Sequence, residues 1–222
     1  MTTAAAPSET DRSAVSSADE LRAILGAPSD RAVRKQLSAL DVHCRAFIAR
    51  SPFLVLSTAN AAGVCDASPK GDVPGFVMVL DDRTLVIPDR PGNRRADSLL
   101  NILDNPHVGL LFLIPGMDET LRVNGSARIV RQEALLERMA VDGRRPQLGI
   151  EVSVEECYLH CAKAFLRSKL WDPTQHMPRS EMPSLARMIQ DQIRPLHRTD
   201  AEHERVVEEH TSNIREAYCN LF

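Results

Sequence analysis

The sequence predicts a mainly β, α+β domain in which an antiparallel sheet is flanked by helices. Short apolar segments come in pairs that are separated by tight turns, as in β-hairpins. Strand–helix–strand units of the kind that build parallel sheets are rare. The chain has 222 residues, 43% of them apolar and 26% charged, which suits one ordinary globular domain with a helical appendage. Six or seven short strands of this kind can close into a barrel.

The N-terminal part is predicted to be a tail followed by helices. Residues 1–17 are rich in Ala, Ser and Thr without periodicity, which predicts a disordered tail. A short helix is expected over residues 19–25, where Gly26 stops it. Asp30 then caps a longer predicted helix, because apolar residues follow at steps of three and four and share one face. These residues are Val33, Leu37, Leu40, Cys44 and Phe47.

The central part is predicted to hold the sheet. Residues 53–58 and 64–68 flank a turn that ends in Gly63, which predicts a hairpin, and residues 76–80 and 84–87 predict a second one. The remaining predicted elements are a helix at 94–103, strands at 107–114 and 119–131, a helix at 133–140 and a last strand at 149–161.

The C-terminal part is predicted to be a connector followed by two helices. Residues 172–183 contain three prolines and are expected to be irregular. Thr199 or Asp200 is expected to cap the last helix. The predicted domains are therefore a tail at 1–17, a barrel domain with N-terminal helices at 18–172, and a connector with helices at 173–222. The apolar stripes of the two last helices are Leu185, Met188, Ile189 and Ile193, then Val207, Ile214, Tyr218 and Leu221.

Composition excludes several classes of partner. The net charge is −3, which argues against binding of nucleic acid or anionic membranes through bulk electrostatics. The longest apolar run, residues 108–114, is far shorter than the ~20 residues of a membrane-spanning helix. Five cysteines are an odd number, which favours reduced thiols, and the first ten residues lack the features of a secretory signal. We therefore expect a cytoplasmic protein without nucleic-acid or membrane partners.

A basic segment, residues 88–95, is the most informative local feature. Asn93 is a good N-cap residue, which would place Arg94 and Arg95 in the first turn of the following helix. The helix dipole disfavours cations there, and a bound phosphate would neutralise them while accepting the free backbone N–H groups. The segment therefore predicts an anion site. The alternative is that Asp89 and Asp97 pair with these arginines at the surface.

A second polar segment follows the first predicted hairpin. Pro69 cannot donate a hydrogen bond to a neighbouring strand, so it indicates a strand edge or terminus. Ser68 and Lys70 could then join the two arginines around one phosphate if the hairpins are neighbours. The alternative, favoured by spacing alone, is that these residues are a polar exit from the strand.

The segment with two cysteines and a histidine near residue 160 invites a zinc interpretation. In an extended strand, Cys157 and Cys161 share one face and His160 lies on the other, so the three cannot close on one ion. We therefore predict no metal site, and expect buried thiols with a structural histidine.

The single tryptophan, Trp171, follows Arg167 and Lys169. An indole beside two cations is a stacking wall for a planar ligand, or a packing anchor for the last helix. Signatures of serine hydrolases, P-loop NTPases and Rossmann folds are absent from the sequence. The residues thus identify no catalytic side chain.

Together, residues 68–72, 85–95, 105–106, 119–125 and 160–171 make the chain similar to a known family. It resembles the pyridoxamine-phosphate-oxidase-like FMN-binding split-barrel flavoproteins, and most closely their branch of FMN-dependent enzymes without an assigned substrate. The resemblance covers about residues 20–172. It implies a six-stranded antiparallel split β-barrel that works as a homodimer, with one FMN at each end of the subunit interface.

The resemblance also implies roles for individual residues. Residues 66–70 would line the flavin, with Lys70 near the phosphate or ring, and Arg94 and Arg95 would bind the FMN phosphate. Cofactor contacts would come from Asp66, Ala67, Ser68, Lys70, Ile87, Pro88, Arg94, Arg95 and Thr120, and from Arg167, Ser168, Lys169 and Trp171 across the subunit interface.

Two departures bear on the expected activity. Cys65 stands where the oxidase has an arginine, and the C-terminal segment lacks the arginine-rich run that binds the substrate phosphate. Oxidation of pyridoxamine phosphate is therefore not predicted. The prediction is an FMN-dependent oxidoreductase whose substrate is open. Its alternatives are a non-catalytic flavin or haem carrier, and a purely structural dimer in which Arg94 and Arg95 pair with Asp97.

Overall fold

The computed structural model describes residues 14–195 and 197–219, and the chain divides into two compact units, residues 1–36 and 37–222. The first unit contains α1 (Ala18–Leu25) and α2 (Asp30–Arg34). Ser17 and Ser29 cap these helices through their side-chain oxygens. The helix predicted at 19–25 is confirmed, whereas most of the tail predicted at 1–17 lies outside the described residues.

The prediction of a single long helix from Asp30 is wrong. This segment forms two helices, α2 and α3 (Val42–Ile48), because the chain between them forms hydrogen bonds with the sheet. Leu37 exchanges two backbone hydrogen bonds with Cys157, at 2.9 and 2.8 Å, and the Leu40 N–H donates to Asp82 O. Asp41 then caps α3, with its carboxylate 2.8 Å from the Cys44 N–H. Pairing with a distant strand has overridden a local helical pattern.

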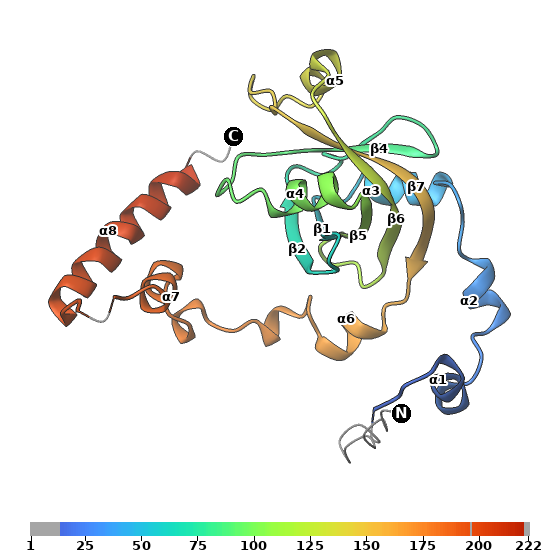
Figure 1. The fold of residues 1–222 in the computed structure, drawn as a ribbon, viewed down its shortest axis with the longest axis horizontal. Helices are drawn as coiled ribbons and strands as arrows, with labels where there is room; N and C mark the ends of the chain where they lie inside the picture. The colour runs from blue at the N-terminus through green and yellow to red at the C-terminus, as the bar shows by residue number, and fades with distance from the viewer. Residues whose placement is uncertain (1–13, 196, 220–222) are drawn as a thin grey trace, which may run out of the picture. The chain divides into compact units, whose positions relative to one another are not determined.

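The second unit is built on one antiparallel sheet of seven strands (Figure 1). Its order is β2-β1-β5-β6-β7-β4-β3, so β2 and β3 are the edges. The strands are β1 (Phe53–Ala59), β2 (Cys65–Gly71), β3 (Met78–Val79), β4 (Thr84–Pro88), β5 (His107–Leu113), β6 (Thr120–Val130) and β7 (Gly149–His160).

Two parts of the predicted architecture are corrected. The sheet has seven strands rather than six, because the short β3 pairs with β4. The sheet is also not closed into a barrel, since no pairing between the edge strands β2 and β3 is found among the described residues. The prediction of an antiparallel sheet with flanking helices is confirmed.

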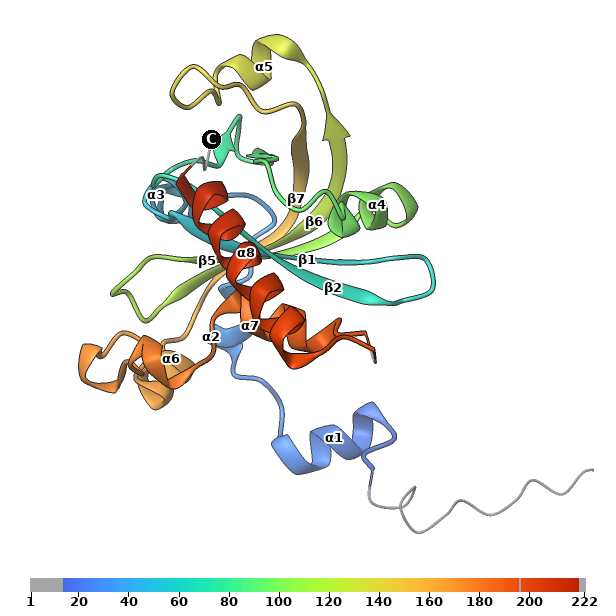
Figure 2. The same ribbon diagram turned by 90° about the vertical axis from the view of Figure 1, so that its left-hand side faces the viewer.

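The long strands β6 and β7 bend around the core (Figures 1 and 2). A register shift lies between Asn124 and Gly125, and a Cβ at Gly125 would collide with the Ser153 carbonyl oxygen, so only glycine fits there. Apolar side chains from both halves of the sheet and from α3 fill the interior, which is why the strands alternate between buried and exposed residues. Core residues include Ile48, Leu54, Leu56, Leu85, Ile87, Leu110, Phe112, Leu121, Val123 and Ile150.

Two buried thiols join α3 to β7. The sulfur atoms of Cys44 and Cys157 lie 3.9 Å apart, and Cys157 also donates to the Ala39 carbonyl. Burial raises the pKa of Cys44 to about 12 and also raises the pKa of Cys157. Both groups are therefore neutral thiols at physiological pH. Cys161 follows the end of β7 and is exposed, so it does not share the environment of Cys157.

The remaining helices connect or follow the strands. Figure 2 shows α4 (Asp97–Asp104) beside the β1–β2 hairpin, and α5 (Glu133–Glu137) lies between β6 and β7 in the chain. Sequence analysis missed α6 (Lys163–Ser168). Among the described residues no helix has both the length and the apolar content needed to cross a membrane.

The C-terminal helices pack against each other through polar side chains. The predicted connector contains two short 3₁₀ turns at Pro173–Gln175 and Arg179–Glu181, and is followed by α7 (Leu185–Gln192) and α8 (Asp200–Cys219). The buried His203 of α8 lies 2.6 Å from Asp191 of α7. Both predicted helices are thus confirmed, although Leu221 of the predicted stripe lies outside the described residues.

Candidate anion-binding cavity

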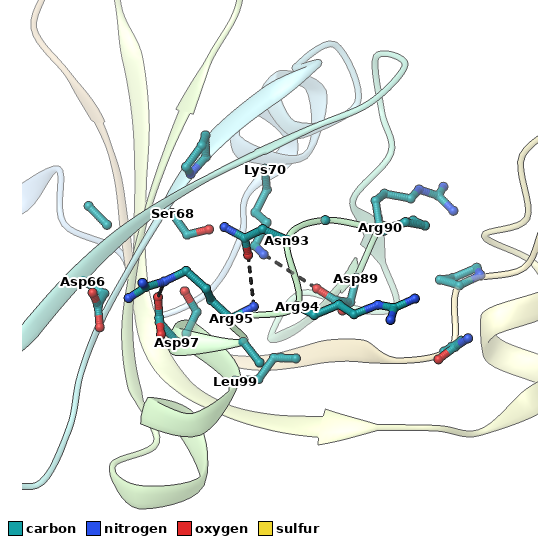
Figure 3. A pocket seen from close by; sticks show the side chains of 18 of the residues that line it. Asp66, Ser68, Lys70, Asp89, Arg90, Asn93, Arg94, Arg95, Asp97 and Leu99 are labelled. Atoms are coloured by element: carbon teal, nitrogen blue, oxygen red, sulfur yellow. Dashed lines mark hydrogen bonds and ion pairs between the residues drawn. The ribbon is translucent and has the colours of Figure 1, made fainter. Parts of the chain in front are cut away.

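A cavity of about 620 Å³ lies where β2, the β4–α4 loop, the start of α4 and the α5–β7 loop meet (Figure 3). Six cationic side chains and three carboxylates line it, so its lining carries a net positive charge although the whole chain is slightly acidic. The cations are Lys70, Arg90, Arg94, Arg95, Arg144 and Arg145, and the carboxylates are Asp66, Asp89 and Asp97.

The edge strand β2 presents one polar face to the cavity. Asp66, Ser68 and Lys70 are half-buried on one face, because side chains two residues apart point the same way in a strand. Ala67 and Pro69 alternate with them and are exposed, although both border the cavity. The strand edge predicted from Pro69 is confirmed, and the predicted strand continues through Lys70 to Gly71.

A buried amide orients the first of these polar groups. The Asn101 side-chain nitrogen donates to the Asp66 carboxylate at 2.8 Å and to the Thr58 hydroxyl at 3.0 Å. Asn101 and Thr58 are both buried, so these hydrogen bonds satisfy groups that water does not reach. The Asp66 carboxylate is therefore held at the cavity wall.

The β4–α4 loop differs from its prediction. Helix α4 begins at Asp97 rather than at Arg94, and Arg94 and Arg95 precede it. Arg94 and Ala96 both have left-handed backbone conformations, with φ of 61° and 58°. This conformation costs a residue other than glycine about 1–3 kcal/mol and clusters at functional sites. The two left-handed residues break the helical path that Asn93 was predicted to start.

The two arginines of this loop do not converge in the structure. Arg95 Nε donates to Asp97 at 2.8 Å, while the Arg95 backbone N–H donates to the Asn93 side chain at 3.0 Å. The hydrogen bond and negative charge of Asp97 raise the pKa of Arg95. Figure 3 shows Arg94 pointing away from Arg95, and its guanidinium has no ion-pair or hydrogen-bond partner among the described residues. The predicted alternative was that Asp89 and Asp97 pair with the two arginines. Asp97 does pair with Arg95, whereas Asp89 forms its ion pair with Lys70, at 3.7 Å.

A buried ion pair links two of the segments that border the cavity. Arg90 Nε lies 2.6 Å from an Asp72 carboxylate oxygen, and the Arg90 guanidinium also donates to the Met139 carbonyl at 2.9 Å. The Asp72 side chain is 0% exposed and that of Arg90 16%. The pair joins the residue after β2 to the loop after β4, which keeps these two walls together.

Several predicted cofactor residues lie outside this cavity. Ile87 and Pro88 are buried in β4 immediately before the cavity loop, and Thr120 is buried at the start of β6. Thr120 pairs with His160, at the opposite end of β7 from the cavity loop. The four predicted residues of the α6 region also lie outside the cavity lining, namely Arg167, Ser168, Lys169 and Trp171.

Trp171 packs within the α6 region. Its ring stacks on Phe165 with the ring centroids 5.7 Å apart, and its N–H donates to the Met117 carbonyl in the β5–β6 turn at 3.0 Å. The packing alternative for this tryptophan is therefore observed, although its contacts are to α6 and a turn rather than to the last helix.

Sequence reasoning missed two groups of cavity residues. Asn101 lies inside α4, where nothing local marks it as a partner of β2. Arg144 and Arg145 follow a helix stop at Asp142–Gly143, and only the pairing of β4 with β7 brings them beside the arginines of the β4–α4 loop. The only feature of the sequence that could have indicated this second group is that Arg144 and Arg145 are adjacent cations.

Comparisons with known proteins give the family. The family model described as pyridoxamine 5'-phosphate oxidase matches residues 40–161, which is more than half of the chain. The chain therefore belongs to the pyridoxamine 5'-phosphate oxidase family, as the resemblance in the sequence predicted. None of the curated proteins matches the chain.

Solved structures with a similar fold include three bacterial proteins. HupZ of Group A Streptococcus is 20% identical with a TM-score of 0.44, covering 54% of this chain and 93% of HupZ. General stress protein 26 of Bacillus anthracis is 19% identical with a TM-score of 0.38, covering 53% and 94%. An FMN-binding protein of Syntrophomonas wolfei is 11% identical with a TM-score of 0.41, covering 53% and 83%.

The cavity residues fit a phosphorylated ligand. Arg94 and Arg144 are cations without a partner among the described residues, and Ser68, Lys70 and Asn93 add donors nearby. Guanidinium groups recognise phosphate oxygens with two parallel hydrogen bonds. The arrangement thus suits the phosphate end of a flavin mononucleotide.

Proposed function

We propose that the chain is a flavin-dependent oxidoreductase that binds FMN with its phosphate at the β4–α4 loop. The observation that carries the proposal is the positively charged cavity around a strained loop, in a member of the pyridoxamine 5'-phosphate oxidase family. Arg94 and Arg95 would bind the phosphate. Because Arg94 has no ion pair to break, its side chain can turn towards a ligand without losing a partner.

Bound FMN would supply hydride and electron transfer, while the protein supplies orientation and polarity. Asp66, Ser68 and Lys70 would face the cofactor along β2, with Asp66 fixed by Asn101. Ala67 would contribute the strand edge. Ile87 and Pro88 would fix the start of the β4–α4 loop, because both are buried at the end of β4 immediately before it.

Binding of FMN tests this proposal directly. The purified full-length chain is expected to carry visible flavin absorbance, or to gain thermal stability when FMN is added. A ligand at a hundredfold excess over its Kd stabilises the folded state by about 2.7 kcal/mol. Riboflavin, which lacks the phosphate, is expected to give a smaller shift. The proposal would be refuted if the protein showed no flavin absorbance and gained no thermal stability when FMN was added.

A non-catalytic flavin carrier would use the same residues. Because the cofactor would do the chemistry in the enzyme, the side chains of the cavity lining do not separate the two candidates. The described lining holds none of the usual axial ligands of haem iron, so a haem carrier has no support from this cavity. Steady-state oxidation of NADH or NADPH by the FMN-loaded protein, with a panel of acceptors, separates the enzyme from the carrier.

We further propose that the flavin ring is completed by a second copy of the chain. The described cavity lining contains no aromatic residue, although a planar ring needs walls on both faces. The predicted residues that lie outside the cavity would then arrive from the partner subunit. These are Thr120, Arg167, Ser168, Lys169 and Trp171.

Subunit mixing is expected to show this shared site. Arg94→Gln/Arg95→Gln removes one half of the proposed site, and Arg167→Gln/Lys169→Gln removes the other half. After unfolding and refolding together, the two variants should regain part of the FMN binding that each lacks alone, because mixed dimers contain one intact site. Sedimentation should show an FMN-loaded dimer. A flavin-loaded monomer, or no recovery on mixing, would contradict the shared site.

A further inference from the structure

The outer face of the sheet is apolar where β1 pairs with β5. Neighbouring residues of a strand point to opposite faces, so the buried core residues alternate with a second set on the outer face. This set is half-buried and belongs to neither core cluster. A solvated face of an antiparallel sheet is typically polar, so this face is suited to being covered. The set pairs across the two strands as Phe53 with Leu113 and Val55 with Leu111.

The helices that pack on the sheet lie on its other face. Among the described residues, α3 and α4 are the helices that pack extensively on the strands. Both lie on the core side, because Ile48 of α3 and Ile102 of α4 belong to the core cluster. The helices α7 and α8 pack extensively only on each other. The described part of the chain therefore packs no helix against the apolar outer face.

The C-terminal arm, residues 173–219, has apolar side chains without a core of their own. Only four of its described residues are buried, and two of these are polar. Short helices are marginal in water unless an apolar face packs against another surface. The arm therefore needs such a surface. Its buried residues are Ala186, Gln190, His203 and Val207, and its exposed large apolar residues are Met177, Met182, Leu185, Ile193 and Tyr218.

Two features identify a second copy of the chain as the owner of that surface. The arm begins directly after residues 167–171, which the proposed shared site places at the partner subunit, so the arm continues over the partner. The charges also match. Arg122 lies beside Leu111 on the outer face, donates to the Tyr158 hydroxyl and pairs with no carboxylate among the described residues. Helix α8 carries six carboxylates and two arginines, so it brings negative charge to this cation.

We propose that the C-terminal arm of one copy packs on the outer face of β1 and β5 of a second copy. Leu185 and Ile193 of α7 would bury themselves against Val55 and Leu111, and two copies would exchange arms symmetrically. This inference rests on the proposed function through the shared site, which directs the arm to the partner. It goes beyond that site because residues 173–219 lie outside the part of the chain that matches the family model.

Sedimentation equilibrium of the full chain, with and without added FMN, tests the exchange of arms. Leu185→Gln/Ile193→Gln should weaken the dimer at least about 10²-fold, because burial of each such side chain contributes at least about tenfold in affinity. Val55→Thr/Leu111→Thr should also weaken it, by at least about tenfold. Far-ultraviolet circular dichroism checks that both double variants stay folded.

The matched control is Ile24→Gln/Leu25→Gln on α1, whose two side chains are 65% and 69% exposed. The control should dimerise as the unmodified chain does, within about twofold. Equal weakening by the control would overturn the proposal, because the loss would then follow from any change of an exposed apolar residue. A full chain that stays monomeric, or two double variants that dimerise normally, would overturn it as well.

Mixing the two double variants shows whether the arm acts on the partner. A mixed dimer keeps one intact contact, between the unmodified arm of one copy and the unmodified outer face of the other. The mixture should therefore dimerise more tightly than either variant alone. No gain on mixing would refute the exchange, because the arm would then cover its own sheet or a different surface.

FMN binding, measured in the same samples, separates this inference from the proposed function. If the chain binds no FMN but the mixture gains affinity, the proposed function fails and the exchange of arms is supported by the two apolar surfaces alone. If the chain binds FMN and the mixture gains nothing, the exchange of arms is refuted while the flavin site is retained.

Discussion

Replacing Arg94 and Arg95 together by glutamine is expected to weaken FMN binding by roughly 10²- to 10⁴-fold. Each charge-assisted hydrogen bond contributes about 1.5–3 kcal/mol, and each 1.4 kcal/mol is a factor of ten in affinity. The affinity for riboflavin should change by less than about threefold, because riboflavin lacks the phosphate that these side chains would bind. Fluorescence titration of both flavins against the unmodified and double-variant proteins gives the two ratios.

Asp97→Asn is the matched control for this experiment. Arg95 Nε donates to Asp97 at 2.8 Å, so removing the carboxylate charge releases Arg95 for the phosphate. FMN binding should then be equal or tighter. If Arg95 serves only to pair with Asp97 and Arg94 binds no ligand, the double variant keeps its FMN affinity and Asp97→Asn has no effect on it. That pair of results would remove the phosphate site from the β4–α4 loop.

Local sequence patterns predicted most of the sheet because alternation and turns are local properties. The hairpin of β1 and β2 follows from alternating residues around Gly63, and Pro69 correctly placed β2 at an edge. Long-range pairing explains the main error among the helices. Leu37 continues the stripe of a helix in the sequence, but its backbone bonds to Cys157, which is 120 residues away.

The candidate site was predictable only where one segment carries it. Arg94 and Arg95 were predicted to form an anion site from their own segment. The left-handed backbone at Arg94 was not predicted, because no local signal requires it. Arg144 and Arg145 reach the cavity through the pairing of β4 with β7, which local patterns do not specify. Nonlocal register thus determines which cations share a cavity.

The same nonlocal geometry makes Asp72 a structural residue of the site. Its buried carboxylate accepts from Arg90 Nε at 2.6 Å and from the Val73 N–H at 2.7 Å, so it bonds both to its own loop and to the loop after β4. Local patterns gave no sign of this role, because the partner lies 18 residues along the chain. The cavity therefore depends on an ion pair whose carboxylate lies outside the cavity lining.

Asp72→Ala is expected to lower the free energy of unfolding by about 3–5 kcal/mol, because it leaves the largely buried Arg90 guanidinium without this carboxylate. Urea denaturation of the flavin-free protein measures the change. Asp72→Asn, which keeps an acceptor oxygen, should lose less, and Asp72→Leu/Arg90→Met should recover much of the loss because neither charge remains buried. A loss below about 1 kcal/mol in Asp72→Ala would show that the pair contributes no more than a surface ion pair does. Other contacts would then hold β2 to the β4–α4 loop.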